Sequence, residues 1–453
     1  MSTTTTHATE VQRLAGWVAG SSWDQLSPEA REALKLRVLD SLGCAAGAMG
    51  TDVLRRLRSE IEEMGGRPLA TLVGGGRTSP DRAALHNAAA VRYLDFNDTF
   101  MASGETCHPS DNLGAVLAAV EFAGGDGKEL LVALAVAYQV QCRLSELAPV
   151  RARGFDHVTQ GAYGAAAGVA RGLRLNPVQT ANAIAIAGTA FNALRVTRTG
   201  NLSNWKGLAY PNTAFAAVHA AFLARAGITG PDEVFEGNKG FKEAIAGPFE
   251  VDWTAEDLEI VRRTSLKRFN AEFHSQSVLE AATELREMGL DPGRVKRVEV
   301  DVFQVAYDII GGGEEGGKKL VRTKEEADHS LPYMTAVALL DGQVLPAQYE
   351  PERIARADVQ DLLQRVHVRA DPELSARFPR EHGCRLRVIL DDGSTLLREK
   401  SDYLGFLSRP AGWDEVERKF RRLGGPGRIV KLVRKLEEIR VGELCAALAH
   451  LGG

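Results

Sequence analysis

A helical spacing of apolar residues runs from about Glu10 to Leu266, and this feature restricts the possible folds more than any other. Ser27-Pro28 and Ser79-Pro80 each place a capping residue before a proline at the first helical position. Gly172 and Gly227 stand where a helix commonly ends, each followed by a turn that contains proline. Aromatic residues make up only 6% of the chain, whereas alanine and glycine are plentiful. We therefore expect closely packed helical hairpins.

The pattern changes after Leu290. Alternating valines predict a strand over 295–303, a second short strand is expected at 366–368, and Asp391-Asp392-Gly393 predicts the turn of a hairpin between 385–390 and 394–399. Helical spacing returns in three segments, 413–423, 428–440 and 441–450. We predict a mainly α fold, in which a large all-helical domain (1–268 and 400–453) receives a smaller inserted α+β lid domain (269–399).

Charge and cysteine content exclude several classes of function. Lys and Arg number 55 and Asp and Glu 59, giving a net charge of −4, so no basic excess favours nucleic acid or an anionic membrane surface. Charged residues interrupt the most apolar stretch, and no membrane span is expected. The N-terminus carries no secretory pattern, and the five scattered cysteines are typical of a cytoplasmic protein with reduced thiols. They also argue against an iron–sulfur cluster.

The segment 95–112 offers one candidate for proton transfer. Pro109 disfavours a helical conformation at His108, and Ser110 or Asp111 is expected to cap a helix beginning near Leu113. His108 would then lie beside a helix N-terminus, which attracts anions. The alternative is that Asp111 only caps the helix and His108 is an exposed loop residue.

Other candidates lie further along the chain. His157 precedes a helix of small residues, Lys206 is expected in a loop before another alanine-rich helix, and Lys267-Arg268 with His274 lies at the predicted domain junction. Cations and a histidine at a domain boundary suit an anionic ligand. Each also has a structural interpretation, as a satisfied histidine, a solvated lysine or a charged hinge. Asp328-His329-Ser330 is expected to be a capping region with a buried histidine, and the glycines at 74–76 and 311–317 are expected to form turns or loops.

Six segments together resemble the 2-methylcitrate dehydratase family, also called the MmgE/PrpD family. They are LDFNDT (94–99), HPSDNLG (108–114), GFDHVTQGAYGAAA (154–167), NWKGLA (204–209), LKRFNAEFHSQS (266–277) and ADHSLPY (327–333). The family includes 2-methylcitrate and citrate dehydratases, cis-aconitate decarboxylase and an epimerase of an iminodisuccinate-type diacid.

The resemblance implies a helical domain with a smaller lid, a site between them that uses no cofactor or metal, and a homodimer. It places Asp95, Thr99, His108, His157, Lys206 and Lys267 at the site. Tyr307 is expected to match a lid tyrosine, and Ser110, Arg268 and His274 are expected to bind substrate. Asn270 stands where many relatives have proline.

These residue types fit the dehydration of a 2-hydroxy tricarboxylate. The reaction needs a base for a C–H proton, an acid for the departing hydroxyl, and cations for the carboxylates and developing negative charge. His108 and His157 are candidates for proton transfer, Lys206, Lys267 and Arg268 for carboxylate binding, Asp95 for orienting a histidine, and Thr99 for a hydrogen bond to substrate. We predict a metal-independent hydro-lyase acting on 2-methylcitrate, with citrate as a further substrate. The alternatives are a cis-aconitate decarboxylase, an epimerase of a dicarboxylate, and a carboxylate-binding scaffold without turnover.

Overall fold

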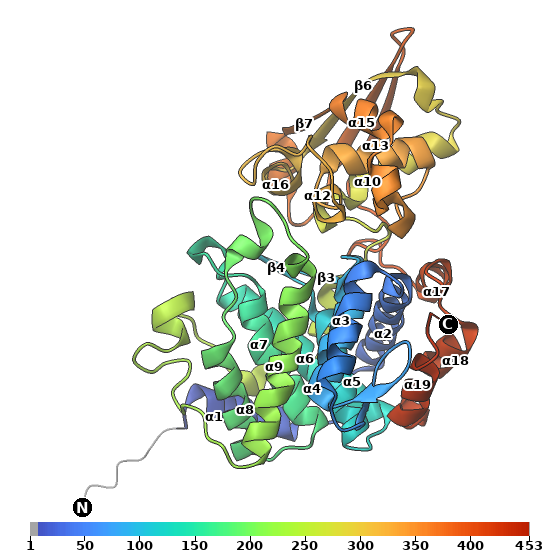
Figure 1. Cartoon of the computed structure of the whole chain (residues 1–453). Coiled ribbons are helices and arrows are strands. Elements are labelled where there is room, and N and C mark those ends of the chain that lie inside the picture. Colours follow the sequence, from blue (N-terminus) through green and yellow to red (C-terminus); the bar gives the residue numbers. More distant parts are fainter. Residues whose placement is uncertain (1–7, 453) are drawn as a thin grey trace, which may run out of the picture.

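The computed structural model describes residues 8–452 and is mainly α-helical (Figure 1). A helical body contains the chain up to about Leu266 and the C-terminal segment. Its helices are α1 Glu10–Gly20, α2 Pro28–Ala48, α3 Asp52–Met64, α4 Pro80–Arg92, α5 Leu113–Phe122, α6 Gly127–Leu147, α7 Val158–Gly172, α8 Pro177–Ala190, α9 Trp205–Arg225, α17 Trp413–Arg422, α18 Gly427–Arg434 and α19 Val441–Leu448. In Figure 1, α17, α18 and α19 lie beside the blue N-terminal helices rather than with the segment that precedes them.

A second body, the α+β body, lies between residues 269 and 400. Its elements are α10 Gln276–Glu287, β6 Val295–Val302, α11 Gln304–Ala306, α12 Lys324–Ala327, α13 Leu331–Asp341, α14 Pro351–Ile354, α15 Ala357–Gln364, β7 Val366–Ala370, α16 Pro372–Arg377, β8 Cys384–Leu390 and β9 Thr395–Lys400. The strands form one sheet in the order β7-β6-β8-β9, with β6 parallel to β7 and antiparallel to β8. The predicted hairpin is present, and Gly393 supplies the positive φ of 82° that its turn requires.

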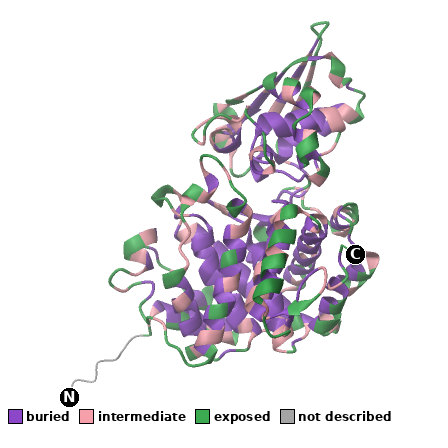
Figure 2. Ribbon diagram, viewed as in Figure 1, coloured by how far each residue is buried: buried purple, intermediate pink, exposed green. Residues whose placement is uncertain are grey.

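Each body has its own hydrophobic core. One buried cluster joins residues between Val11 and Leu266 with residues between Val416 and Leu451, and a second joins residues between Phe269 and Leu390. Figure 2 shows buried residues concentrated inside each body. The C-terminal helices therefore complete the core of the helical body, since α17 packs on α2 and α18 packs on α19 and α2.

The helical body is not all-helical, contrary to the prediction. It contains the pair β1 Ala70–Thr71 and β2 Arg77–Thr78, and the small antiparallel sheet β4-β3-β5. The strands of that sheet are β3 Thr99–Ala102, β4 Glu105–Cys107 and β5 Thr264–Ser265. Thr99 pairs with Ser265, so the sheet fixes the chain after Asp98 beside the chain before Lys267. Backbone pairing of distant segments leaves little short-range signal in a sequence.

Two predicted helix ends behave differently. Gly227, with φ 94°, follows α9 as expected. Gly172 instead remains within α7, and Arg174 takes the left-handed conformation with φ 56°. A Cβ at residue 172 would lie 2.9 Å from Val120 Cγ2, so the glycine permits close contact between helices.

Among the described residues, α6 is long and apolar enough to cross a bilayer by length and composition. It is also a core helix, because 83% of its most apolar window is buried inside the protein. The helix packs mainly against α7.

Candidate active site

A buried polar cavity lies where the two bodies meet, with a volume of about 60 Å³. The residues that line it come from both bodies: Arg92, Asp95, Glu105, Thr106, His108, Arg151, His157, Arg195, Arg198, Lys267, Glu272, Phe273, His274, Ile309, Glu315 and His329. Five of the predicted site residues, Asp95, His108, His157, Lys267 and His274, are thus brought together.

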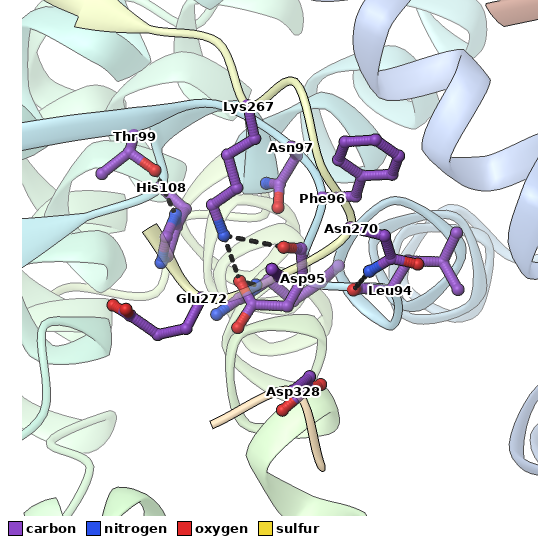
Figure 3. Close-up of polar contacts among 12 residues, drawn as sticks. Leu94, Asp95, Phe96, Asn97, Thr99, His108, Lys267, Asn270, Glu272 and Asp328 are labelled. Atoms are coloured by element: carbon purple, nitrogen blue, oxygen red, sulfur yellow. Dashed lines mark hydrogen bonds and ion pairs between the residues drawn. The ribbon is translucent and has the colours of Figure 1, made fainter. Parts of the chain in front are cut away.

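Asp95 stands in the turn that follows α4, with a left-handed φ of 55° that aspartate tolerates better than most residues. Its carboxylate Oδ1 accepts hydrogen bonds from Arg92 Nη1 and Lys267 Nζ, both at 2.7 Å. Lys267 also donates to the backbone carbonyl of Asp95 at 2.7 Å (Figure 3). Desolvation opposes ionisation of Asp95, but the charges of Arg92 and Lys267 outweigh it and hold the pKa well below its ordinary value.

His108 is buried, so the interpretation as an exposed loop residue is wrong. Its Nδ1 lies 2.8 Å from the carbonyl oxygen of Asp98 and 3.3 Å from Thr99 Oγ1. Because a carbonyl only accepts, Nδ1 carries the proton and Nε2 has the free lone pair. Desolvation and the charge of Arg92 lower the pKa of His108 well below its ordinary value. His108 is therefore a neutral imidazole whose Nε2 carries a free lone pair.

The predicted cap after His108 is absent. Residues Pro109–Asn112 form a short 3₁₀ turn, and α5 begins without a side-chain cap. Asp111 Oδ1 and Ser110 Oγ instead accept hydrogen bonds from Asn97 Nδ2, at 2.7 and 2.8 Å. The side chains of Ser110 and Asp111 therefore bind the buried amide of Asn97 and do not cap α5.

His157 lies at the start of α7, and its ring meets that of His108 edge-to-face with centroids 5.5 Å apart. Arg198 Nη2 lies 3.3 Å from His157 Nε2. A guanidinium only donates, so Nε2 accepts and Nδ1 carries the proton. No described residue hydrogen-bonds this buried Nδ1. Desolvation lowers the pKa of His157 to about 3, and the ring is neutral.

Lys206 is in the first turn of α9, not in a loop, and Pro211 lies inside the same helix. The proline removes only the backbone donor that would serve Gly207. Lys206 Nζ lies 2.7 Å from Asp328 Oδ1 and 2.8 Å from His329 Nδ1, and 3.6 Å from Asp95 Oδ2. Lys206 does not line the cavity, and it binds protein groups behind it.

The groups around Lys206 include a possible metal-ligand set. Potential ligand atoms of Asp95, Asp328 and His329 lie within 4.8 Å of one another. The ammonium group of Lys206 lies within hydrogen-bond distance of two of these residues. The ammonium group of Lys206 therefore already supplies the positive charge that a metal ion would bring to these residues.

Four other predicted residues do not line the cavity. Arg268 pairs with Glu280, and it lines a separate cavity of about 140 Å³ beside α17. Tyr307 starts a π-helical turn in which Ile309, not the tyrosine, reaches the candidate site. Thr99 and Ser110 are buried behind it, Thr99 beside His108.

The other residues that line the cavity were not predicted from the sequence to be site residues. Arg151 and Arg195 both contact Glu315 Oε1, at 3.1 and 2.9 Å, and so join the helical body to the glycine-rich loop of the α+β body. His329 belongs to a segment that the sequence marked as a capping region with a buried histidine, and Glu272 stands between Lys267 and His274. No local sequence pattern pointed to the arginines, because they come from separate elements that meet only after folding.

Asn270, the position expected to hold proline in many relatives, joins the bodies as well. Its backbone N–H donates to the Val344 carbonyl at 3.1 Å, and its side chain donates to the Leu94 carbonyl next to Asp95. A proline here would lack both of these donors.

Comparisons with known proteins agree with the resemblance seen in the sequence. The MmgE/PrpD N-terminal domain matches residues 12–254, and the MmgE/PrpD C-terminal domain matches residues 269–439. Cis-aconitate decarboxylase of Mus musculus is 25% identical, covering 97% of this chain and 92% of its own length. Two 2-methylcitrate dehydratases are also similar. That of Escherichia coli (strain K12) is 27% identical over 75% of this chain and 74% of its own length, and that of Salmonella typhi is 29% identical over 79% and 78%.

The match to the MmgE/PrpD C-terminal domain ends at residue 439, whereas the inserted α+β domain that we predict from the sequence ends at residue 399. Both domain matches together cover most of the chain, and the similar enzymes are lyases by name. The chain therefore belongs to the MmgE/PrpD family.

Proposed function

We propose that this protein is a hydro-lyase that dehydrates 2-methylcitrate, and citrate as a second substrate, to the cis-aconitate-type alkene acid. The observation that carries the proposal is the free Nε2 lone pair of the neutral His108, which lines a buried cavity together with cationic groups. Several relatives are named 2-methylcitrate dehydratase, which supports this substrate class.

In this mechanism, His108 Nε2 removes a C–H proton next to a substrate carboxylate. The Nδ1–H bond to the Asp98 carbonyl holds the ring in the required tautomer and stabilises the imidazolium that forms. Negative charge then develops on the substrate carboxylate as the carbon acquires enolate character.

Lys267 provides a donor to that charge. Its ammonium group has three hydrogens and uses two of them on Asp95, so one remains for a ligand in the cavity. Asp95 acts by holding Lys267 in place, rather than by orienting a histidine.

Glu315 of the α+β body lines the cavity and pairs with Arg151 and Arg195 of the helical body. We infer that these pairs rearrange when substrate enters.

The reaction is tested by incubating EDTA-treated protein separately with 2-methylcitrate, citrate and cis-aconitate and following products by NMR. Formation of the alkene acid from the first two supports the dehydratase. Itaconate and CO₂ from cis-aconitate would instead establish a decarboxylase, the alternative that the long match to the mouse enzyme favours. If no tricarboxylate reacts, hydrogen–deuterium exchange into dicarboxylates tests for the epimerase.

A further inference from the structure

Dehydration needs a proton for the departing hydroxyl, and the histidines do not supply it. His108 and His157 are both neutral, and a neutral imidazole N–H is a very weak acid. The ammonium of Lys206 is held by Asp328 and His329 behind the cavity. In the proposed mechanism the ammonium of Lys267 stabilises the developing carboxylate charge. If the proposed function is correct, the carboxyl groups that line the cavity are therefore the next candidates for the acid.

Glu272 has the required position. It lines the cavity in the same segment as Lys267, and its carboxyl Oε2 accepts a hydrogen bond of 2.7 Å from the backbone N–H of His274. Figure 3 shows Glu272 on the same side of Lys267 as His108, with its carboxyl group directed away from Asp95. No described residue hydrogen-bonds Oε1, and this oxygen is not among the enclosed, unpartnered atoms. The carboxyl group is therefore anchored through one oxygen and offers the other to a ligand.

The surroundings of Glu272 keep its proton available near neutral pH. Burial raises its pKa to about 7, with Lys267 opposing the rise and the negative charges of Asp95 and Glu315 adding to it. Lys318 is a further cation close enough to interact with Glu272. The other titratable groups that face the same cavity are Arg92, Glu105, His108, Arg151, His157, Arg195, Arg198, His274 and His329.

We propose that Glu272 is the catalytic acid that protonates the leaving hydroxyl, an assignment that rests on the proposed dehydratase function. His108 Nε2 takes the C–H proton, and the electrons of that bond form the alkene as the C–O bond breaks. The oxygen leaves with the C–O electron pair and takes the proton of the Glu272 carboxyl, which yields water. Loss of a proton from the His108 imidazolium to solvent, and gain of one by the Glu272 carboxylate, restores both groups.

Glu272→Gln tests this assignment, because glutamine retains an oxygen acceptor for the His274 N–H but has no transferable proton. We expect kcat for 2-methylcitrate to fall by about 100- to 10,000-fold, with a much smaller change in KM. The wild-type kcat should decline above about pH 7 as Glu272 ionises, and the residual rate of the variant should lack this decline. Glu60→Gln, at an exposed position on α3, is the matched control and should retain wild-type kinetics. An unchanged melting temperature of Glu272→Gln excludes misfolding.

A substrate analogue with fluorine in place of the departing hydroxyl distinguishes acid catalysis by Glu272 from a purely structural role of this residue. Fluoride departs with less need for protonation, so the Glu272→Gln defect should shrink to less than about 10-fold with this analogue. An equal defect with both substrates would overturn the role as acid, as would wild-type activity in Glu272→Gln. Failure of the wild-type enzyme to form any alkene would instead overturn the proposed function itself.

Discussion

Lys267 Nζ donates to both the side-chain Oδ1 and the backbone carbonyl of Asp95, each at 2.7 Å. The two residues are 172 positions apart, and this contact joins the turn after α4 to the segment between β5 and α10. The pair is buried, and Arg92 provides the second cation for Asp95. A buried ion pair of this kind is costly to disrupt, because removing one partner leaves the other charge poorly compensated.

Lys267→Met should therefore lower both stability and activity. We expect the free energy of unfolding to fall by about 3 kcal/mol, as for loss of one partner of a buried pair. Urea denaturation measures this change, and Lys296→Met, at an exposed position on β6, is the control. Equal stability of the two variants would contradict the structural role of Lys267.

His108→Asn should remove the base while leaving a donor for the Asp98 carbonyl. We expect kcat to fall by about 100- to 10,000-fold, as for loss of a general base, with little change in melting temperature. Steady-state kinetics with 2-methylcitrate measure the effect. His219→Asn, at an exposed position on α9, should behave as the wild type, and unchanged activity in His108→Asn would eliminate His108 as the base.

Lys206→Ala should convert the cluster of Asp95, Asp328 and His329 into a metal site. Without the ammonium group, two carboxylates and an imidazole remain close enough to bind one Zn²⁺, with water completing the coordination. We expect added ZnCl₂ to raise the melting temperature of the variant, since a ligand that binds only the folded state stabilises it.

EDTA should reverse that rise, and the wild-type protein should show none. Lys296→Ala serves as the control for loss of an unrelated lysine. Identical melting temperatures of Lys206→Ala with and without ZnCl₂ would show that the three side chains do not form a site.

His382 should make the protein less stable as the pH falls. Burial lowers its pKa from an ordinary 6.5 to about 3. The unfolded chain therefore binds a proton between these values and the folded chain does not, so stability present above pH 6.5 is lost on acidification. Between pH 6.5 and 5.0 this loss amounts to about 2 kcal/mol.

His382→Gln should remove that part of the pH dependence. Urea denaturation at pH 7.5 and 5.0 should give a smaller loss of stability for the variant than for the wild type. His219→Gln should lose as much stability as the wild type, because His219 is exposed. An unchanged difference in His382→Gln would mean that His382 titrates normally in the folded protein.

The homodimer expected from the family resemblance has a candidate surface. Leu194, Val196 and Trp205 are 61%, 71% and 50% exposed and border a hollow of about 450 Å³. If two copies meet here, Val196→Asp should shift the protein from dimer to monomer in light scattering, because it places a charge in an apolar contact. Val178→Asp, at an equally exposed valine, should leave the mass unchanged. A dimer that survives Val196→Asp would place the interface elsewhere.

The local sequence by itself determined many individual elements. Ser27 caps α2 as predicted, because a serine followed by proline provides both a side-chain acceptor and a preset φ. Alternation of valines specified β6, and the β8–β9 hairpin follows from its Asp-Asp-Gly turn. The segments around Asp95, His108, His157 and Lys267 also identified residues that meet in one cavity.

Only the tertiary structure decided the chemical state and partners of those residues. The tautomers of His108 and His157 depend on the Asp98 carbonyl and on Arg198, which approaches His157 from 41 positions away. Lys206 binds Asp328 across 122 positions, and so it is held behind the cavity rather than in it. Hydrogen bonds and desolvation act through space, whereas local sequence patterns record neighbours along the chain. For this reason the sequence identified much of the site, while the fold determined which nitrogen carries a proton and which cation remains available to a ligand.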